Sequence, residues 1–159
     1  MPTPIRDKRD SLPHHAKKKY MPRSGPWTIA IIHHSLTSGG SAEAFARYHV
    51  TENNWPGIGY HYVINIDGTI DWCQSHETKS YHVGKHNGYC LGICMVGDFR
   101  KSQPDPRQIQ SAYRILKEIL NVTDPTKIMG HSELPGYDWK KCPVIDMNVF
   151  RAEYKALLP

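Results

Sequence analysis

Two short segments that lie almost a hundred residues apart place the strongest constraint on how this chain folds. The first, Ile31-Ile32-His33-His34-Ser35, ends an apolar run, and the second contains His131 and, further on, Cys142. Two imidazoles and one thiolate brought together by folding make a three-ligand zinc site. A structural zinc site usually takes four protein ligands, whereas a catalytic site keeps three and leaves a position for water. The sequence therefore predicts a hydrolase with one zinc ion (Zn2+) per chain.

The spacing of apolar residues predicts alternating strands and helices. At 159 residues the chain is long enough for a single domain that buries about two thirds of its unfolded surface. Apolar and alternating runs predict strands, and helical spacing predicts helices, the most regular of them over 108–120. We expect an α/β fold in which helices flank a sheet, with strands over 27–33, 60–66, 69–73, 89–96 and 127–129 and helices over 42–51, 108–120 and a segment after Asp146.

Local signals predict where several of these elements begin and end. Ser41 is a suitable N-cap for the first helix, and Asp105-Pro106 a suitable start for the second. Asp67-Gly68 is expected to form a two-residue hairpin turn. Asp146 is expected to cap a last helix that packs Val149, Phe150, Tyr154 and Leu157 against the core.

Basic residues are concentrated before the first strand. The net charge is +5, and Lys17, Lys18 and Lys19 lie in this segment. We predict a basic, solvated N-terminal arm over 1–26 and a catalytic domain over 27–159. The charge favours an anionic partner such as cell wall. No specific nucleic acid is expected, because no aromatic-interleaved binding motif accompanies the lysines.

The chain has neither a membrane-spanning stretch of ~20 apolar residues nor the apolar middle of a signal peptide. We therefore expect synthesis in the cytoplasm. The four cysteines are too scattered for a disulfide framework. Cys73, Cys90 and Cys94 leave two alternatives, a second metal site or buried free thiols. Buried thiols are favoured, because Cys90 and Cys94 should share one face of an apolar strand.

Four strings carry a family resemblance: IIHHSLT, GYHYVINIDGTI, YHVGKHNGYCLGICMVGDF and GHSELPGYDWKKCP. In this order they resemble type 2 N-acetylmuramoyl-L-alanine amidases, the superfamily that includes phage lysozyme-amidases and peptidoglycan recognition proteins. The resemblance covers residues 27–158 and implies a central mixed β-sheet flanked by helices. It also implies hydrolysis of the amide between N-acetylmuramic acid and L-alanine in bacterial peptidoglycan. We expect a phage endolysin that acts on the wall after release by a pore-forming partner.

The resemblance also implies roles for single residues. His33 and His34 should point to opposite faces of a strand, and the resemblance selects His33 as the ligand beside His131 and Cys142. It assigns Tyr60 and Lys140 to the tetrahedral intermediate, although Lys141 next to Lys140 leaves the register open by one residue. His34, His82 and Asn87 are predicted substrate contacts, with a structural role as the alternative for His82 and Asn87.

Cys94 is a departure from many relatives, which carry a glutamate that serves as general base at this position. Without that carboxylate, the chain resembles the phage lysozyme-amidases more closely. Three alternatives stay open: a non-hydrolytic peptidoglycan-binding recognition module, a bacterial autolysin or recycling amidase, and a regulatory binder of an intracellular polymerase. The sequence predicts no oligomeric state.

Overall fold

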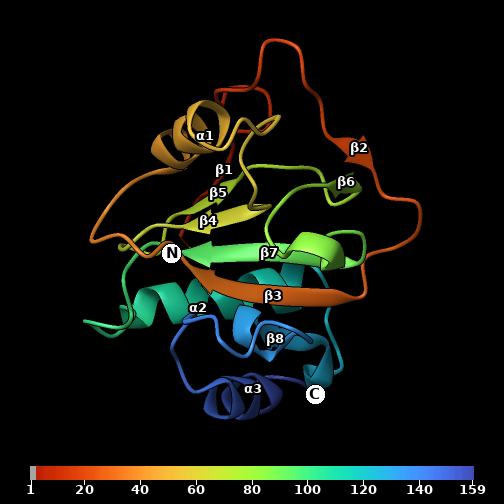
Figure 1. Cartoon of the computed structure of the whole chain (residues 1–159). Helices are drawn as coiled ribbons and strands as arrows, with labels where there is room; N and C mark the ends of the chain where they lie inside the picture. The colour runs from red at the N-terminus through yellow and green to blue at the C-terminus, as the bar shows by residue number, and fades with distance from the viewer. Residues whose placement is uncertain (1–2) are drawn as a thin grey trace.

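The computed structural model describes residues 3–159, in which a mixed six-stranded sheet lies between helices (Figure 1). Neighbouring strands run parallel except β4 and β5, which form an antiparallel hairpin. A separate antiparallel pair joins β2 (Met21–Pro22) to β6 (Thr78–Lys79). The order across the main sheet is β1 (Ile5–Asp7), β5 (Ile70–Trp72), β4 (Tyr62–Ile64), β7 (Cys90–Met95), β3 (Ile29–His34) and β8 (Ile128–Gly130).

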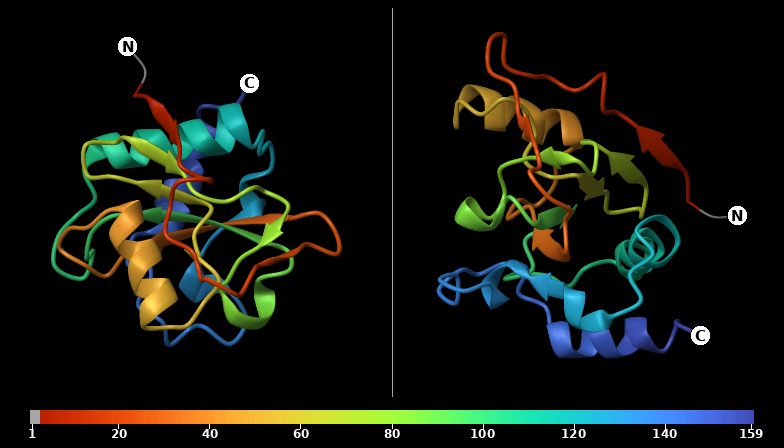
Figure 2. Two further views of the ribbon diagram at one scale, coloured as in Figure 1. Left: turned by 90° about the horizontal axis from the view of Figure 1, so that it is seen from above. Right: turned by 90° about the vertical axis from the view of Figure 1, so that its right-hand side faces the viewer.

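Helices cover both faces of the sheet (Figure 2). On one side α1 (Ala42–Thr51) packs Ala42 and Ala46 against Val63. On the other side, α2 (Pro106–Arg114) and α3 (Met147–Lys155) enclose the larger core cluster. The predicted α/β architecture is confirmed, and each central strand is buried from both sides.

Strand β3 shows how the sheet separates its two faces. Ala30 and Ile32 belong to the core under α2 and α3, whereas Ile31 belongs to a cluster on the opposite face. Because side chains alternate along a strand, His33 lies on the face of Ile31 and His34 on the face of Ile32. The two adjacent histidines therefore have different surroundings, as predicted.

The helix starts agree with the sequence, but two helix details do not. The side chain of Ser41 accepts a hydrogen bond from the Ala44 amide, Asp105 and Gln108 form a capping box, and Asp146 caps α3. The helix predicted over 108–120 is α-helical only to Arg114. It continues as a π-helix, η2 (Ile115–Ile119), in which the Leu120 amide donates to the carbonyl of Ile115.

Two side chains expected to pack in the last helix are exposed. Val149 and Leu157 are 50% and 46% exposed, whereas Phe150 and Tyr154 are buried. Val149 lies on the face of α3 that does not meet the sheet. Leu157 lies beyond Lys155, where α3 ends, and Leu158 packs against the core in its place.

The hairpin turn is longer than predicted. The Asn65 amide donates to the Thr69 carbonyl, so three residues form the loop. Of these, Gly68 has a positive φ of 89°. The Asp67 side chain instead accepts a hydrogen bond from the Thr69 amide. This carboxylate contact favours a three-residue loop with glycine in the left-handed position over a two-residue turn.

The N-terminal segment is not the solvated arm that the charge pattern suggested. Strand β1 pairs with β5 and extends the sheet at its edge. Arg6 donates to Asp71, which is fully buried, and the Lys8 ammonium lies 3.5 Å from the same carboxylate. Lysines 17–19 are exposed, as expected. The segment is integral to the fold because its cations compensate a buried acid.

Arg23 attaches this segment to the loops before β7. Its guanidinium donates to four backbone carbonyls, those of His76, Asn87, Gly88 and Cys90, at 2.7–3.1 Å. Burial lowers the pKa of Arg23. The carbonyls satisfy the donors, and the arginine in turn fixes the approach to a strand that carries part of the site described below.

No helix in residues 3–159 is long and apolar enough to cross a membrane.

We expect Arg23→Met to lower the free energy of unfolding by about 2–4 kcal/mol, because it removes hydrogen bonds from a charged donor and leaves carbonyls unpaired. Urea denaturation followed by circular dichroism measures the change. Lys19→Met, in the same segment but exposed, should stay within about 0.5 kcal/mol of the unchanged protein. Equal stabilities of the two variants would contradict an anchoring role for Arg23.

Candidate functional site

Parallel strand pairing brings the three predicted metal ligands together. Ile32 on β3 is in register with Gly130 on β8, so the residues that follow, His33 and His131, leave the sheet side by side. His131 begins a short 3-10 helix, η4 (His131–Glu133), and Cys142 returns on the loop after it. The Ser132 amide donates to the carbonyl of Cys142 and holds this return.

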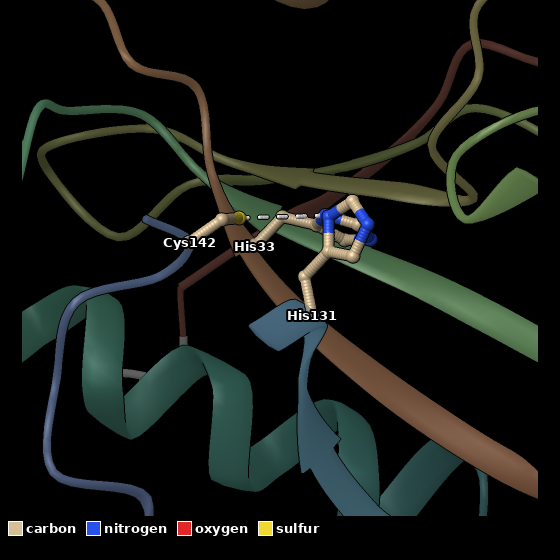
Figure 3. Close-up of side chains that lie close together, drawn as sticks. All are labelled: His33, His131 and Cys142. Carbon is tan, nitrogen blue, oxygen red and sulfur yellow. Dashed lines mark hydrogen bonds between the residues drawn. The ribbon is translucent and has the colours of Figure 1, made fainter. Parts of the chain in front are cut away.

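The three side chains point toward one another (Figure 3). One ligand atom from each residue lies within 4.8 Å of the others, and all three residues are buried. The Cys142 Sγ is 3.6 Å from the His33 Nδ1. Two imidazole nitrogens and one sulfur at this separation form a donor set suited to zinc, with room for a fourth ligand.

A chain of hydrogen bonds fixes which nitrogen of His33 is free. The His82 Nε2 lies 3.2 Å from the Cys90 carbonyl, which can only accept, so this nitrogen carries the proton. Burial lowers the pKa of His82 to about 3, and its neutral ring must therefore accept at Nδ1. The His33 Nε2 donates to that atom at 2.9 Å. Consequently the lone pair of His33 Nδ1 faces Cys142 and is available to a metal.

The close approach of His82 depends on Gly92 of β7. A Cβ at position 92 would lie 2.8 Å from the His82 Nδ1, closer than nonbonded atoms approach. From the sequence, His82 is a predicted substrate contact. The ring does line the cavity described below, but its polar atoms are engaged with His33 and Cys90. The clearest structural role of His82 is to orient His33, one of the three candidate metal ligands.

His131 has a buried atom without a partner. Within residues 3–159, the Nε2 of His131 is a buried side-chain atom that forms no hydrogen bond. Burial lowers the pKa of His131 to about 4, so the ring is neutral near pH 7. Leaving a buried polar atom unpaired costs about 1–3 kcal/mol. An ion bound at this nitrogen would remove that cost, and the site therefore fits a metal.

Cys142 is protonated when no metal is present. Burial raises the pKa of its thiol to about 11, although the nearby Lys140 lowers it. A zinc ligand must be the thiolate, so binding a metal here releases a proton. Lys140 lines the cavity together with all three ligands. Burial lowers the pKa values of His33 and His131, and the charge of Lys140 adds to that effect.

The ligands lie at the floor of a cavity of about 730 Å³. Helix α1 and the segment after it form one wall, with Phe45, Tyr48 and Trp55, and the loop with Lys140 and Lys141 lies opposite. Neither aspartate nor glutamate is among its lining residues in the part of the chain that the structure describes. The aromatic wall was missed by the sequence analysis, although Tyr48 and Trp55 near a predicted helix end were a usable signal.

Tyr60 lies beside the ligands, and its ring centroid is 5.2 Å from that of His33. Burial and the neighbouring Cys94 and Cys142 raise its pKa well above 10. The phenol therefore stays protonated and can donate a hydrogen bond. Cys94 is buried and in register with His33, at the position where relatives were expected to carry a glutamate. The four cysteines are all free and buried.

His34 and Asn87 have structural partners. The His34 Nδ1 accepts from the Phe99 amide, and its Nε2 donates to the Lys141 carbonyl at 2.7 Å, which ties β3 to the residue before Cys142. Asn87 accepts from the amides of His82 and Val83 and is not among the lining residues of the cavity. Substrate contact stays a prediction for all three residues, and the observed contacts of Asn87 hold the loop that carries His82.

Comparison with known proteins identifies one family and two kinds of relative. The family model described as N-acetylmuramoyl-L-alanine amidase matches residues 23–144. Peptidoglycan-recognition protein SC1a of Drosophila melanogaster is 27% identical over 124 residues, 67% of this chain and 66% of the relative. The endolysin of Enterobacteria phage T3 is 26% identical over 141 residues, 84% of this chain and 90% of the relative. This chain thus spans just under two thirds of the first of these relatives.

Solved structures share the fold. The Ph2119 endolysin of a Thermus scotoductus bacteriophage superposes with a TM-score of 0.76 at 22% identity, covering 96% of this chain and 99% of the endolysin. Wild-type Drosophila PGRP-LB gives a TM-score of 0.75 at 23% identity, covering 98% of this chain and 94% of that protein. At these identities the likeness concerns the fold.

We expect His82→Ala to weaken zinc affinity by about tenfold to a hundredfold, because His33 loses the acceptor that fixes its tautomer and orientation. Competition with a chromogenic chelator measures the affinity without any assay of activity. His14→Ala removes an exposed histidine and should leave the affinity unchanged. Unchanged affinity in His82→Ala would show that the hydrogen-bond chain does not orient the ligand.

Proposed function

The chain belongs to the N-acetylmuramoyl-L-alanine amidase family, and from this premise we propose that it is a zinc-dependent hydrolase of bacterial peptidoglycan. The bond cut is the amide between N-acetylmuramic acid and the L-alanine of the stem peptide. The observation that carries the proposal is the buried set His33, His131 and Cys142, with one unpaired nitrogen and an open cavity above it. A binding module that had lost catalysis would not need to keep these buried ligands intact.

His33 through Nδ1, His131 and the Cys142 thiolate would hold the zinc ion. When bound, zinc supplies Lewis acidity, which polarises a carbonyl and lowers the pKa of water toward neutrality. The protein contributes a neutral imidazole pair and a fixed tautomer. The three residues are only 2–5% exposed, so their burial also limits the access of other molecules that could compete for the metal.

Tyr60 and Lys140 would stabilise the oxyanion that forms when the amide carbonyl is attacked. The raised pKa of Tyr60 keeps its proton in place for donation, and the positive charge of Lys140 acts on the same small volume as the ligands. Fixed donors aimed at developing charge typically account for a large part of catalysis. Lys140 is preferred to Lys141 because its charge depresses the pKa values of His33, His131 and Cys142.

No carboxylate from residues 3–159 lines the cavity, so the proton traffic of the reaction must use other groups. Glu133, two residues after His131, is engaged elsewhere: it accepts from the Gly130 amide and pairs with Arg151. It therefore supports the turn that presents His131. Proton transfer falls to water, Tyr60 and Lys140.

A phage endolysin is the setting that we propose. Two kinds of relative were found, endolysins and peptidoglycan-recognition proteins, and the intact ligand set favours the catalytic kind. The net charge of +5 suits a wall rich in carboxylates and phosphates. In this setting the protein acts on the wall after release through a pore made by a separate protein.

We expect digestion of purified peptidoglycan to release new L-alanine amino termini and no new reducing sugar ends. Amine labelling and a reducing-end assay on the same digest distinguish the two bonds. Chelator treatment should abolish the release of amino termini, and added zinc should restore it. New reducing ends would make the protein a glycosidase, and binding without either product would make it a recognition module.

We expect Tyr60→Phe and Lys140→Ala to lower kcat by about tenfold to a thousandfold while zinc content stays near one per chain, because these groups act on the oxyanion and not on the metal. Lys141→Ala is the matched control and should lose little activity. If Lys141→Ala were inactive and Lys140→Ala active, the assignment of the lysine would be wrong by one residue.

A further inference from the structure

Trp139 is an exposed aromatic side chain that the proposed reaction does not use. It is 68% exposed, although tryptophan is usually largely buried. Its indole Nε1 nevertheless donates to the Gly136 carbonyl at 2.9 Å, and the Lys140 amide donates to the Tyr137 carbonyl across the same turn. The ring is therefore exposed and at the same time held in one orientation.

A series of rings connects Trp139 to the metal ligands. The ring centroid of Tyr137 is 6.1 Å from that of Trp139 and 4.6 Å from that of His131. Tyr137 is itself anchored, since its hydroxyl lies over Gly84, where a Cβ would approach to 2.4 Å. Trp139 thus lies within about 11 Å of a ligand ring and beside the cavity-lining Lys140, whose Nζ is 5.5 Å from the indole centroid.

The scissile amide has a peptide on one side and a sugar on the other. From the ligands the cavity extends toward α1 and an aromatic corner made by Trp55 and Tyr81, whose centroids are 5.9 Å apart. If one arm of the substrate occupies that end, the other can leave past Lys140 and Lys141, which line the cavity next to Trp139 in the chain. Exposed, rigid aromatic side chains at such positions supply contact area at low entropic cost.

We propose that Trp139 is a stacking platform for a pyranose ring of the glycan strand, namely the N-acetylhexosamine next to the muramic acid. This rests on the proposed function and names the part of the substrate that the loop binds. The C–H face of the pyranose would cover the indole, and its hydroxyl edge would meet the polar neighbours Asp138 and Lys141, both exposed. Those charges make the patch unsuited to an acyl chain, which needs contiguous apolar surface.

The first test uses the β-1,4-linked tetramer of N-acetylglucosamine as a probe. This glycan carries no peptide and therefore lacks the amide bond that the enzyme would cut. Titration followed by the indole N–H signals in NMR should show Trp139 shifting on binding. Trp139→Ala should raise Kd by about fivefold to tenfold, and Trp139→Tyr should largely restore binding, because a ring is retained. Met21→Ala, at an equally exposed position on β2, should leave Kd unchanged.

Unchanged tetramer binding in Trp139→Ala would overturn the proposal. Its failure is distinguishable from failure of the proposed function, because binding of the tetramer needs no hydrolysis. Conversely, suppose that the protein binds the tetramer through Trp139 but releases no amino termini from cell wall. The glycan site would then be supported and the proposed amidase activity contradicted.

Kinetics give an independent readout. On polymeric peptidoglycan Trp139→Ala should raise KM by about fivefold to tenfold with kcat unchanged. On N-acetylmuramoyl-L-alanyl-D-isoglutamine, which has no neighbouring sugar, KM should be the same in both proteins. An equal loss on both substrates would indicate that Trp139 only supports the loop, and would contradict the proposal.

Discussion

The parallel pairing of β3 with β7 on one side and β8 on the other is the constraint on which the rest of this structure depends. It brings the carboxyl ends of the three strands to one edge of the sheet, with His33, Cys94 and the residue after Gly130 in adjacent positions. Alternation along β3 then sends His33 to the cavity face and His34 to the opposite face. A shift of one residue in this register would exchange the two histidines and dismantle the site.

The site is cationic and desolvated, and it has no acidic lining within residues 3–159. Burial keeps His33, His82 and His131 neutral and keeps Tyr60 protonated, so each group is already in the form that metal binding or donation requires. Cys142 is the exception, since it must lose a proton first. Such a site would suit a cation that can displace that proton, as zinc does when a thiolate is its ligand.

The hydrogen bonds around the site extend its rigidity outward. His82 links β3 to β7, His34 links β3 to the loop before Cys142, and Arg23 fixes the segment between His82 and β7 from the other side. Apart from the bond between His82 and Cys90, these contacts join residues far apart in the sequence. The N-terminal segment therefore contributes to the site indirectly, by holding the strand against which His82 rests.

The sequence by itself determined the identities of the three candidate ligands, the starts of the three α-helices and the alternation at His33 and His34, because each depends on residue chemistry or on local periodicity. Only the tertiary structure decided which nitrogen of His33 is free and that His82 lies behind it. It also decided that Arg6 and Arg23 are structural, although they looked like solvated charges, since the carboxylate and carbonyl groups that they bind lie more than fifty residues away. Charge and spacing along a chain do not specify such partners, because the fold brings them together through backbone pairing whose register is set by the whole sheet.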